Sequence, residues 1–417
     1  MTDEPSRPVF PRHVTAEVQA ALDDTRVVVL HGARQTGKST LVNAIAAARA
    51  DARVVTLDDP PVLAAARADP VLFVQHDVLL VSDEVQRAPE LLLPIKSAVD
   101  RDPRPGRFLL TGSAHVLTLP RLADSLAGRM DVIELAPLTQ GEIAGRPETF
   151  ADRVLSRDAR WPPVVQTSKA ELLALAAAGG FPEARRRDTG RRRNAWFSAY
   201  LRAYVERDVR DIADIEHRAQ MRTLLALVAA RSANLLNIDD LARDSRLPSS
   251  TARRYLEILE ASFLAVRLPA WSSNVTQRTV SSPKVYVADS GLCAHLLGSD
   301  IEALAQAGAP AGPLIETFAL LEIRRQLGWS ATVATLHHLR TKDKLEVDGV
   351  LEARDGRVAG VEVKAGATVT SRDFRGLRWL AAKTGARFTN GVVLYSGEQA
   401  LPFGPGLWAL PMPVVWA

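Results

Sequence analysis

The stretch GARQTGKS, residues 32–39, constrains the fold more than any other part of the sequence. It matches the pattern G-x-x-x-x-G-K-[ST] and stands between the apolar run RVVVL and the helix-like segment STLVNAIAAARA. Glycines in such a loop let backbone N–H groups turn toward phosphate oxygens, and the N-terminus of the following helix adds positive potential. The alternative is an ordinary glycine-containing turn, which the complete motif with correct flanks disfavours. The sequence therefore predicts a loop that holds the phosphates of a nucleotide.

The residues of this loop have predicted roles in binding ATP and Mg²⁺. Lys38 would reach the β- and γ-phosphates, and the Ser39 hydroxyl would ligate Mg²⁺. The residues expected to contact the nucleotide are Gly32, Ala33, Arg34, Gln35, Thr36, Gly37, Lys38, Ser39 and Thr40.

A second piece of the predicted site is VLLVSDE, residues 78–84, an apolar strand that ends in two acids. Asp83 would hold Mg²⁺ through water, and Glu84 would polarise the attacking water. A strand that ends in a solvated acidic turn is the alternative, and the complete phosphate loop upstream disfavours it. The second acid favours hydrolysis of ATP over a switch GTPase.

Two further segments supply candidate catalytic residues. Thr111 or Ser113 in FLLTGSA would sense the γ-phosphate, or would instead cap the next helix, and both interpretations stay open. Arg129 in DSLAGRM stands where an oligomeric ATPase presents an arginine to the γ-phosphate of a neighbouring subunit. The alternative for Arg129 is an ordinary surface arginine.

The surrounding pattern predicts an α/β fold. Between residues 25 and 135, the aliphatic runs RVVVL, RVVTL, HDVLLVSDE, RFLLTGS and MDVIEL alternate with helix-like segments, which is typical of parallel strands with crossover helices. A chain of 417 residues is expected to form more than one domain. No apolar run is long enough to span a membrane, and the single cysteine, Cys293, fits a cytoplasmic location.

Taken together, these motifs resemble those of an AAA+ ATPase. GARQTGKSTL, TLDDP, DEVQRAPELL, LLTGSA, SLAGR and APLTQGE look like the phrases of bacterial and archaeal AAA-type ATPases with a C-terminal domain of unknown function. The resemblance implies a regular oligomer, for which we expect a hexamer, with ATP sites at the subunit interfaces. The lids of such ATPases usually offer a second sensor arginine. Here GGFPEARRR puts Glu183 near that place and leaves Arg185 as a weak candidate.

The segment 224–270 is interpreted as a winged helix-turn-helix. Residues 238–244 form its first short helix, and Ser249 is expected to cap a second helix that runs through Glu260. The outward residues at the start of this second helix are Ser249, Ser250, Arg253 and Arg254, where a recognition helix touches DNA. Many such modules bind protein instead, so both partners stay open. The upstream arginine triplets would neutralise phosphates or form a solvated helix face.

The last hundred residues resemble the core of PD-(D/E)xK nucleases. Glu316 lies on a predicted helix, Asp348 ends the strand LEVD, and Glu362 and Lys364 lie two apart in GVEVK. Asp348 and Glu362 would bind Mg²⁺ and Lys364 would activate water, so we expect all four side chains to converge in one metal-sized pocket, without fast cleavage. His115, His337 and His338 have no partners at metal-ligand spacing.

The expected organisation is therefore a AAA+ P-loop core over residues 1–145, a helical lid or connector over 146–215, a winged helix over 216–304 and a nuclease-like α/β domain over 313–417. The expected function is an oligomeric DNA-binding motor or remodeller that acts on branched or single-stranded DNA in repair or recombination. The alternative is an ATP-dependent signalling or defence regulator whose winged helix binds a protein partner. No membrane partner is expected.

Overall fold

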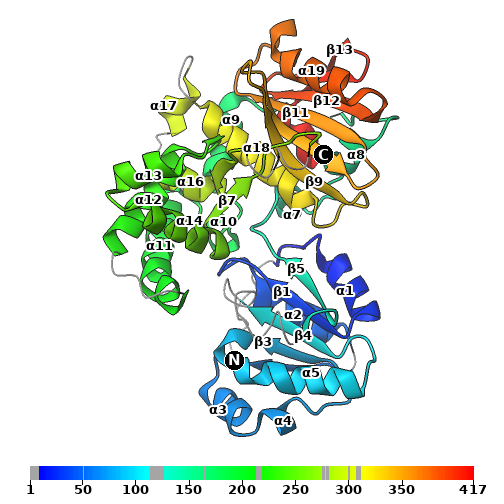
Figure 1. Cartoon of the computed structure of the whole chain (residues 1–417), viewed down its shortest axis with the longest axis vertical. Coiled ribbons are helices and arrows are strands. Elements are labelled where there is room, and N and C mark those ends of the chain that lie inside the picture. The colour runs from blue at the N-terminus through cyan, green and yellow to red at the C-terminus, as the bar shows by residue number, and fades with distance from the viewer. Residues whose placement is uncertain are drawn as a thin grey trace.

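The computed structural model describes residues 9–49, 51–112, 126–163, 166–212, 218–274, 278, 281–298, 301–306 and 311–417, without the side chains of residues 205–212 and 218. An N-terminal α/β domain lies at the lower end of the molecule, most of the middle helices lie at the upper left, and the C-terminal sheet lies at the upper right with α8 beside it (Figure 1). Within the described ranges, no helix is long and apolar enough to cross a membrane.

The N-terminal domain is built on a parallel sheet in the strand order β2-β3-β4-β1-β5. Its strands are β1 (Val27–His31), β2 (Arg53–Thr56), β3 (Leu80–Asp83), β4 (Phe108–Gly112) and β5 (Met130–Glu134). Its helices are α1 (Thr15–Asp24), α2 (Lys38–Ala47), α3 (Pro60–Ala68), α4 (Pro70–Phe73) and α5 (Leu92–Arg101). This arrangement confirms the predicted α/β fold.

Both faces of this sheet are covered. Val27 and Val29 of β1 belong to one apolar cluster, whereas Val28 and Leu30 belong to another. Successive side chains of a strand point to opposite faces, so a continuous aliphatic run requires a cover on each side. The carboxyl ends of the parallel strands meet at one edge, where the sequence motifs also lie.

The middle of the chain is mostly helical. Its elements are α7 (Gln140–Ala144), α8 (Phe150–Leu155), α9 (Lys169–Ala178), α10 (Pro182–Arg185), α11 (Gly190–Ile212), α12 (Arg218–Ala230), α13 (Ile238–Ser245), α14 (Ser249–Ala261), α16 (Ser290–Leu297) and α17 (Ile301–Ala305). Three short strands, β6 (Asn234–Leu235), β7 (Ala265–Leu268) and β8 (Lys284–Val287), form an antiparallel sheet in the order β6-β8-β7. β8 is the central strand and pairs with both β6 and β7.

The C-terminal domain is built on a mixed sheet in the order β13-β14-β12-β11-β10-β9. Its strands are β9 (Ala334–Arg340), β10 (Glu346–Ala353), β11 (Val358–Lys364), β12 (Phe388–Tyr395), β13 (Leu401–Gly404) and β14 (Leu407–Pro411). Two helices, α18 (Gly312–Gln326) and α19 (Arg375–Thr384), pack on β10 and β11 within separate apolar clusters, and so cover opposite faces.

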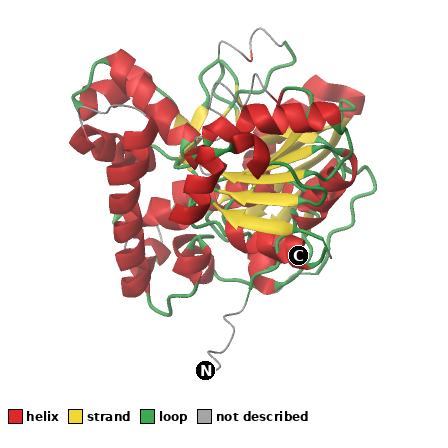
Figure 2. Ribbon diagram, turned by 90° about the horizontal axis from the view of Figure 1, so that it is seen from below, coloured by secondary structure: helices red, strands yellow, loops and turns green. Residues whose placement is uncertain are grey.

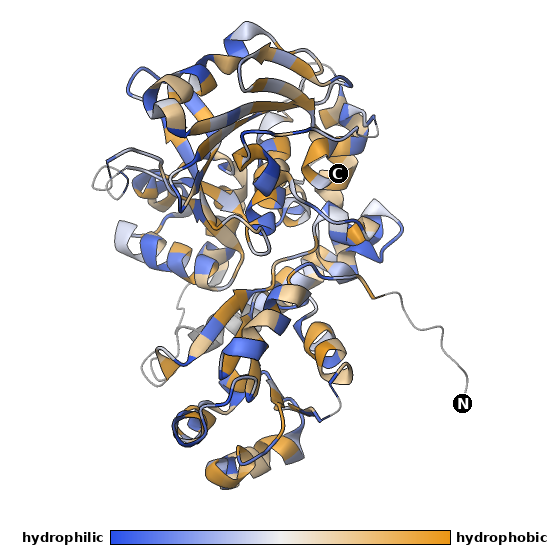
Figure 3. Ribbon diagram, turned by 90° about the vertical axis from the view of Figure 1, so that its right-hand side faces the viewer, coloured by the Kyte–Doolittle hydropathy of each residue, from blue (hydrophilic) through white to orange (hydrophobic). Residues whose placement is uncertain are grey.

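Hydrophobic residues follow the same layering. Figure 2 shows strands enclosed between helices. The ribbon of the C-terminal sheet is largely hydrophobic, whereas the helices around it carry both hydrophobic and hydrophilic residues (Figure 3). Burial of one face of each helix against an apolar sheet is the expected source of this pattern.

The segment predicted as one helical lid, residues 146–215, is divided between two neighbours. α8 packs against β10, β11 and β12 of the C-terminal sheet, and α9 packs against α16, α17 and α18. α10 instead lies beside the phosphate loop, because Pro182 and Glu183 line the same cavity as that loop. The reason is the composition of α8 and α9: both carry buried aliphatic side chains that need an apolar partner surface.

Candidate nucleotide-binding site

The phosphate loop connects β1 to α2 at the carboxyl edge of the N-terminal sheet. A Cβ atom on Gly32 would stand 2.3 Å from the carbonyl oxygen of Leu135, so only glycine fits against the segment that follows β5. Gly37, the residue before α2, has φ of 97°, a conformation that favours glycine. Both glycines of the motif are therefore required by the backbone path.

Lys38 points back into the loop. Its side chain is buried (5% exposed), and its ammonium donates to the carbonyl oxygens of Gly32 at 3.0 Å and Ala33 at 2.9 Å. A phosphate group offers stronger, charged acceptors than these carbonyls. The ammonium is therefore already held close to the place where the motif predicts the phosphates.

Asp83 brings three elements together. Its Oδ2 accepts a hydrogen bond of 2.8 Å from Ser39 on α2, and its Oδ1 accepts one from Thr111 on β4. The Thr111 hydroxyl also accepts from the backbone N–H of Glu84 at 3.2 Å. Hydroxyl and carboxylate oxygens are the ligands that Mg²⁺ prefers, so Ser39 and Asp83 fit the predicted metal role. Ser113, the other sensor candidate, lies outside the described residues.

Glu84, the residue after Asp83, has an unusual backbone conformation. Its φ of 60° and ψ of 45° are left-handed, which is uncommon for a residue other than glycine and is often found at functional sites. Its carboxylate accepts a hydrogen bond from the side chain of Gln86, and both residues line the cavity beside the phosphate loop. Gln86 was not foreseen from the sequence.

The cavity at this edge has a volume of about 1160 Å³. The phosphate loop and the first turns of α2 line one side, together with Glu84 and Gln86. The other lining residues include residues 9–12 from the N-terminal segment, Asp58 and Arg67 from the part that follows β2, and Pro182, Glu183, Arg186 and Tyr204 from the helical part. This volume is sufficient for a small-molecule ligand of nucleotide size.

Arg12 is a site residue that the sequence motifs missed. Its side chain (8% exposed) donates to the carbonyl oxygens of Thr36 at 2.7 Å and Ala136 at 2.6 Å, and to Glu142 Oε1 at 3.1 Å. Arg12 thus fixes the phosphate loop to the segment that follows β5. No motif surrounds it in the sequence, so no local signal marks it.

The arginine in the predicted lid position is Arg186, not Arg185. Arg186 lines the cavity and pairs with Glu183 at 2.5 Å. Arg185 does not line it, and burial lowers the pKa of its guanidinium. The candidate from the sequence is therefore displaced by one residue, because α10 turns the next side chain toward the phosphate loop.

Arg129 lies outside the cavity of its own chain. Its guanidinium pairs with Asp100 of α5, with 2.5 Å between Nε and Oδ1, and this hydrogen bond lowers the pKa of Asp100. The side chain is partly exposed. A role at a neighbouring subunit would require release from Asp100.

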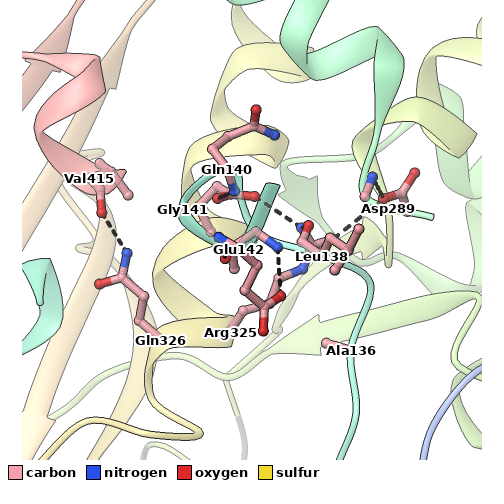
Figure 4. Close-up of polar contacts among 12 residues, drawn as sticks. Ala136, Leu138, Gln140, Gly141, Glu142, Asp289, Arg325, Gln326 and Val415 are labelled. Atoms are coloured by element: carbon pink, nitrogen blue, oxygen red, sulfur yellow. Dashed lines mark hydrogen bonds and ion pairs between the residues drawn. The ribbon is translucent and has the colours of Figure 1, made fainter. Parts of the chain in front are cut away.

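A network of polar contacts joins this site to the C-terminal domain through the end of α18 (Figure 4). Glu322 accepts from the backbone N–H of Gln140 at 2.8 Å, and Arg325 donates to the carbonyl oxygen of Leu138 at 3.1 Å. Arg325 also pairs with Glu322 at 3.0 Å and with Asp289 at 3.5 Å. Asp289 caps α16, because its Oδ1 accepts a hydrogen bond of 3.0 Å from the backbone N–H of Leu292.

Comparison with known proteins agrees with this geometry. The family model described as "AAA domain" matches residues 24–144, which include the phosphate loop, Asp83, Thr111 and Arg129. The chain is 30% identical over 403 residues to the uncharacterized protein Rv2008c of Mycobacterium tuberculosis and to its counterpart Mb2031c of Mycobacterium bovis, covering 96% of this chain and 83% of each relative. The chain belongs to the AAA-type P-loop ATPases.

Other matches cover the rest of this AAA-type ATPase. Two family models described as domains of unknown function match residues 169–302 (DUF8612) and 311–415 (DUF4143). The Walker-type ATPase PABY2304 of Pyrococcus abyssi matches with a TM-score of 0.44 at 16% identity, over 69% of this chain and 96% of that one. AMPPCP-bound DnaA from Aquifex aeolicus matches with a TM-score of 0.30 at 15% identity, over 60% and 86%. At such scores these structural likenesses carry no further conclusion.

The predicted DNA-contacting residues lie at the start of α14. Ser249 does not cap the helix: Pro248 holds the N-cap position, and the Ser249 hydroxyl donates to Asp239 Oδ1 at 2.8 Å. Ser250, Arg253 and Arg254 are exposed. Among the described residues, neither of these two arginines has an ion-pair partner.

The predicted second metal site is not formed. Glu316, Asp348 and Glu362 do gather, but the ammonium of Lys284 stands between Glu316 and Asp348, at 2.7 Å and 2.9 Å from their carboxylate oxygens. Lys364 pairs with Glu362 at 2.8 Å. No group of three or more His, Cys, Asp or Glu side chains is placed to hold a metal ion within the described part of the chain.

Proposed function

We propose that this AAA-type ATPase hydrolyses ATP with Mg²⁺ at the cavity beside the phosphate loop. The contact between Ser39 and Asp83, with Lys38 buried in the same loop, is the observation that carries this proposal. In this role Lys38 binds the phosphates, Ser39 and Asp83 hold the metal ion, and Glu84 orients the attacking water. Bound Mg²⁺ supplies charge neutralisation at the transferred phosphoryl group.

Thr111 and Arg186 have supporting roles in this proposal. Thr111 holds Asp83 in place through its hydroxyl, so it acts through Asp83 and the Glu84 backbone. Arg186 reaches the cavity from α10, where it can sense whether phosphates are present. Its pairing with Glu183 keeps the guanidinium at that position.

The active form in this proposal is an oligomer, for which we propose a hexamer. The support is the place of Arg129: it lies outside its own cavity and is partly exposed, as expected of an arginine that serves a neighbouring subunit. Such an arginine stabilises the negative charge that develops in the transition state.

We further propose that ATP hydrolysis drives action on DNA. The order α12, β6, α13, α14, β7, β8 is that of a winged helix, and α14 takes the place of its recognition helix. The observation in favour is the pair of exposed arginines at the start of α14, Arg253 and Arg254, without ion-pair partners among the described residues. Branched or single-stranded DNA is the proposed target. The C-terminal domain would bind this DNA without cleaving it.

One observation favours a protein partner instead. Asp239 lies against Ser249, and Asp240 and Asp244 follow on the same short helix, α13. Asp240 and Asp244 pair with Arg243, so it is the carboxylate of Asp239, beside the start of α14, that would repel the phosphates of DNA. The second candidate function is therefore a signalling or defence regulator whose winged helix binds a protein.

One experiment distinguishes the two candidate functions. The ATPase rate is measured without DNA and with single-stranded, duplex or four-way-junction DNA, at one fixed low salt concentration. The DNA proposal expects stimulation by at least one of these, and its loss in Arg253→Glu/Arg254→Glu. The control is Arg49→Glu/Arg104→Glu, which also reverses two arginine charges, on the surface of the N-terminal domain and outside the cavity. No binding and no stimulation by any DNA at low salt, where phosphate contacts are strongest, would favour the protein partner.

A further inference from the structure

The acidic centre of the C-terminal domain is assembled from separate elements. Glu316 comes from α18, Asp348 from β10 and Glu362 from β11. Lys284 enters from β8, the central strand of the small antiparallel sheet. The centre therefore lies where the middle part of the chain meets the C-terminal sheet.

Both carboxylates next to Lys284 are also held by other donors. The hydroxyl of Tyr286 donates to Glu316 Oε1 at 2.9 Å, the same oxygen that accepts from Lys284. The backbone N–H of Val363 donates to Asp348 Oδ2 at 3.0 Å, while Asp348 Oδ1 faces Lys284. The distances to the Lys284 ammonium are those of charge-assisted hydrogen bonds.

Glu362 provides a second, independent observation that this centre favours a cation. Its residue is 8% exposed, and its Oε2 is buried with no hydrogen-bond partner among the described residues. Its Oε1 accepts from Lys364. A buried carboxylate oxygen without a donor is unfavourable, so a cation at this centre has a further ligand available.

Lys284 cannot easily leave this position. The side chain is buried (5% exposed), and β8 is paired on both sides, with β6 and with β7. The chain just before it is also fixed, because His338 of β9 contacts the carbonyl oxygen of Ser282 at 3.1 Å. Moving the ammonium away would require the two parts of the molecule to separate.

We propose that the ammonium of Lys284 is the resident cation of this centre and takes the place that a divalent metal ion would otherwise occupy between Glu316 and Asp348. The residues present do not fit the metal ion that a nuclease-like centre implies, because the ammonium of Lys284 already supplies the positive charge between Glu316 and Asp348. The centre is a structural junction without metal-dependent cleavage. Removal of the Lys284 charge is expected to convert it into a divalent-cation site.

The test is Mn²⁺ binding to the full-length protein without nucleotide, followed by the electron paramagnetic resonance signal of free Mn²⁺. Lys284→Met is expected to bind one equivalent more than the wild type. Lys284→Met/Asp348→Asn should lose this gain, and Lys284→Arg, which keeps the charge, should never show it. Any Mn²⁺ held at the phosphate loop is the same in all four proteins and cancels in the comparison.

Thermal unfolding supplies a second readout, because Lys284→Met leaves two buried carboxylates without their cation. Mn²⁺ is expected to raise the Tm of Lys284→Met by more than that of the wild type and of Lys284→Arg, because any stabilisation from Mn²⁺ at the phosphate loop is common to all three. The proposal is overturned if Lys284→Met gains neither Mn²⁺ nor stability, including the case where it is unfolded and Mn²⁺ does not restore it. An equivalent of Mn²⁺ on the wild type that Asp348→Asn removes would overturn it as well.

Discussion

At the scale of single residues, Arg12 shows how the phosphate loop is held from outside its own motif. It donates to the Thr36 carbonyl within the loop and to Glu142, which lies 130 residues away in the sequence. We predict that Arg12→Ala weakens ATP binding by about tenfold, because the loss of hydrogen bonds from a charged donor typically costs about 1.5–3 kcal/mol and lets the loop relax. Titration with a fluorescent ATP analogue measures this change.

The control for Arg12 is Arg49→Ala, which removes an arginine that pairs with Asp23 on the surface of the same domain. Its ATP affinity should equal that of the wild type. Equal affinities for Arg12→Ala and Arg49→Ala would mean that the loop keeps its shape without Arg12.

The candidate residues whose places could be predicted from the sequence share one property: each belongs to a contiguous motif at the end of a strand. Lys38, Ser39 and Asp83 could be placed because parallel strands bring their carboxyl ends to one edge of the sheet. Arg12 and Lys284 could not, because their contacts depend on how distant segments pack. Lys284 and Asp348, for example, are 64 residues apart and belong to different sheets.

At the scale of elements, α18 joins the ATPase core to the C-terminal sheet. Arg325 compensates the charge of Glu322, which is fully buried and also accepts from the Gln140 N–H. We predict that Arg325→Ala lowers the free energy of unfolding by about 3–5 kcal/mol, because it leaves a buried carboxylate without its partner. The midpoint and slope of urea-induced unfolding measure this loss.

A matched surface pair provides the comparison for α18. Arg340 pairs with Glu346 at 2.8 Å, with both side chains exposed, so Arg340→Ala should change the free energy of unfolding by about 1 kcal/mol or less. If Arg325→Ala were no more destabilising than Arg340→Ala, the contacts of Arg325 on α18 would not stabilise the junction between the ATPase core and the C-terminal sheet.

Element prediction failed where burial overrides local pattern. The described part of residues 146–215 contains the helices α8 to α11, but α8 packs on the C-terminal sheet and does not join the others in one lid or connector. Helical periodicity predicts which face of a helix is apolar, but it does not predict which other element packs against that face. Ser249 likewise has the residue type of a helix cap, yet its hydroxyl donates to Asp239 because α13 lies against the start of α14.

At the scale of the whole molecule, the proposed oligomer places Arg129 at the ATP site of a neighbour. We predict that Arg129→Ala and Lys38→Ala proteins are each inactive alone and regain part of the ATPase rate when mixed, because each supplies the half-site that the other lacks. The double variant Lys38→Ala/Arg129→Ala, mixed with Arg129→Ala, should give no recovery, because neither protein supplies the arginine. An ATPase rate that stays absent in the first mixture, or a strict monomer at saturating ATP, would rule out action in trans.

The central claim is that Lys38, Asp83 and Glu84 form one Mg²⁺-dependent site for ATP hydrolysis. The most direct measurement is the rate of phosphate release at saturating ATP for the wild type, Lys38→Ala and Glu84→Gln, with and without EDTA. The wild type should turn over only without EDTA, and Lys38→Ala should neither bind nor hydrolyse ATP. Glu84→Gln should retain bound ATP and lose about 10²–10⁴-fold in rate, the range for loss of a general base. The control is Glu17→Gln, at an exposed glutamate of α1 outside the cavity. A wild-type rate in both Lys38→Ala and Glu84→Gln, or a Glu84→Gln rate equal to that of Glu17→Gln, would contradict the account.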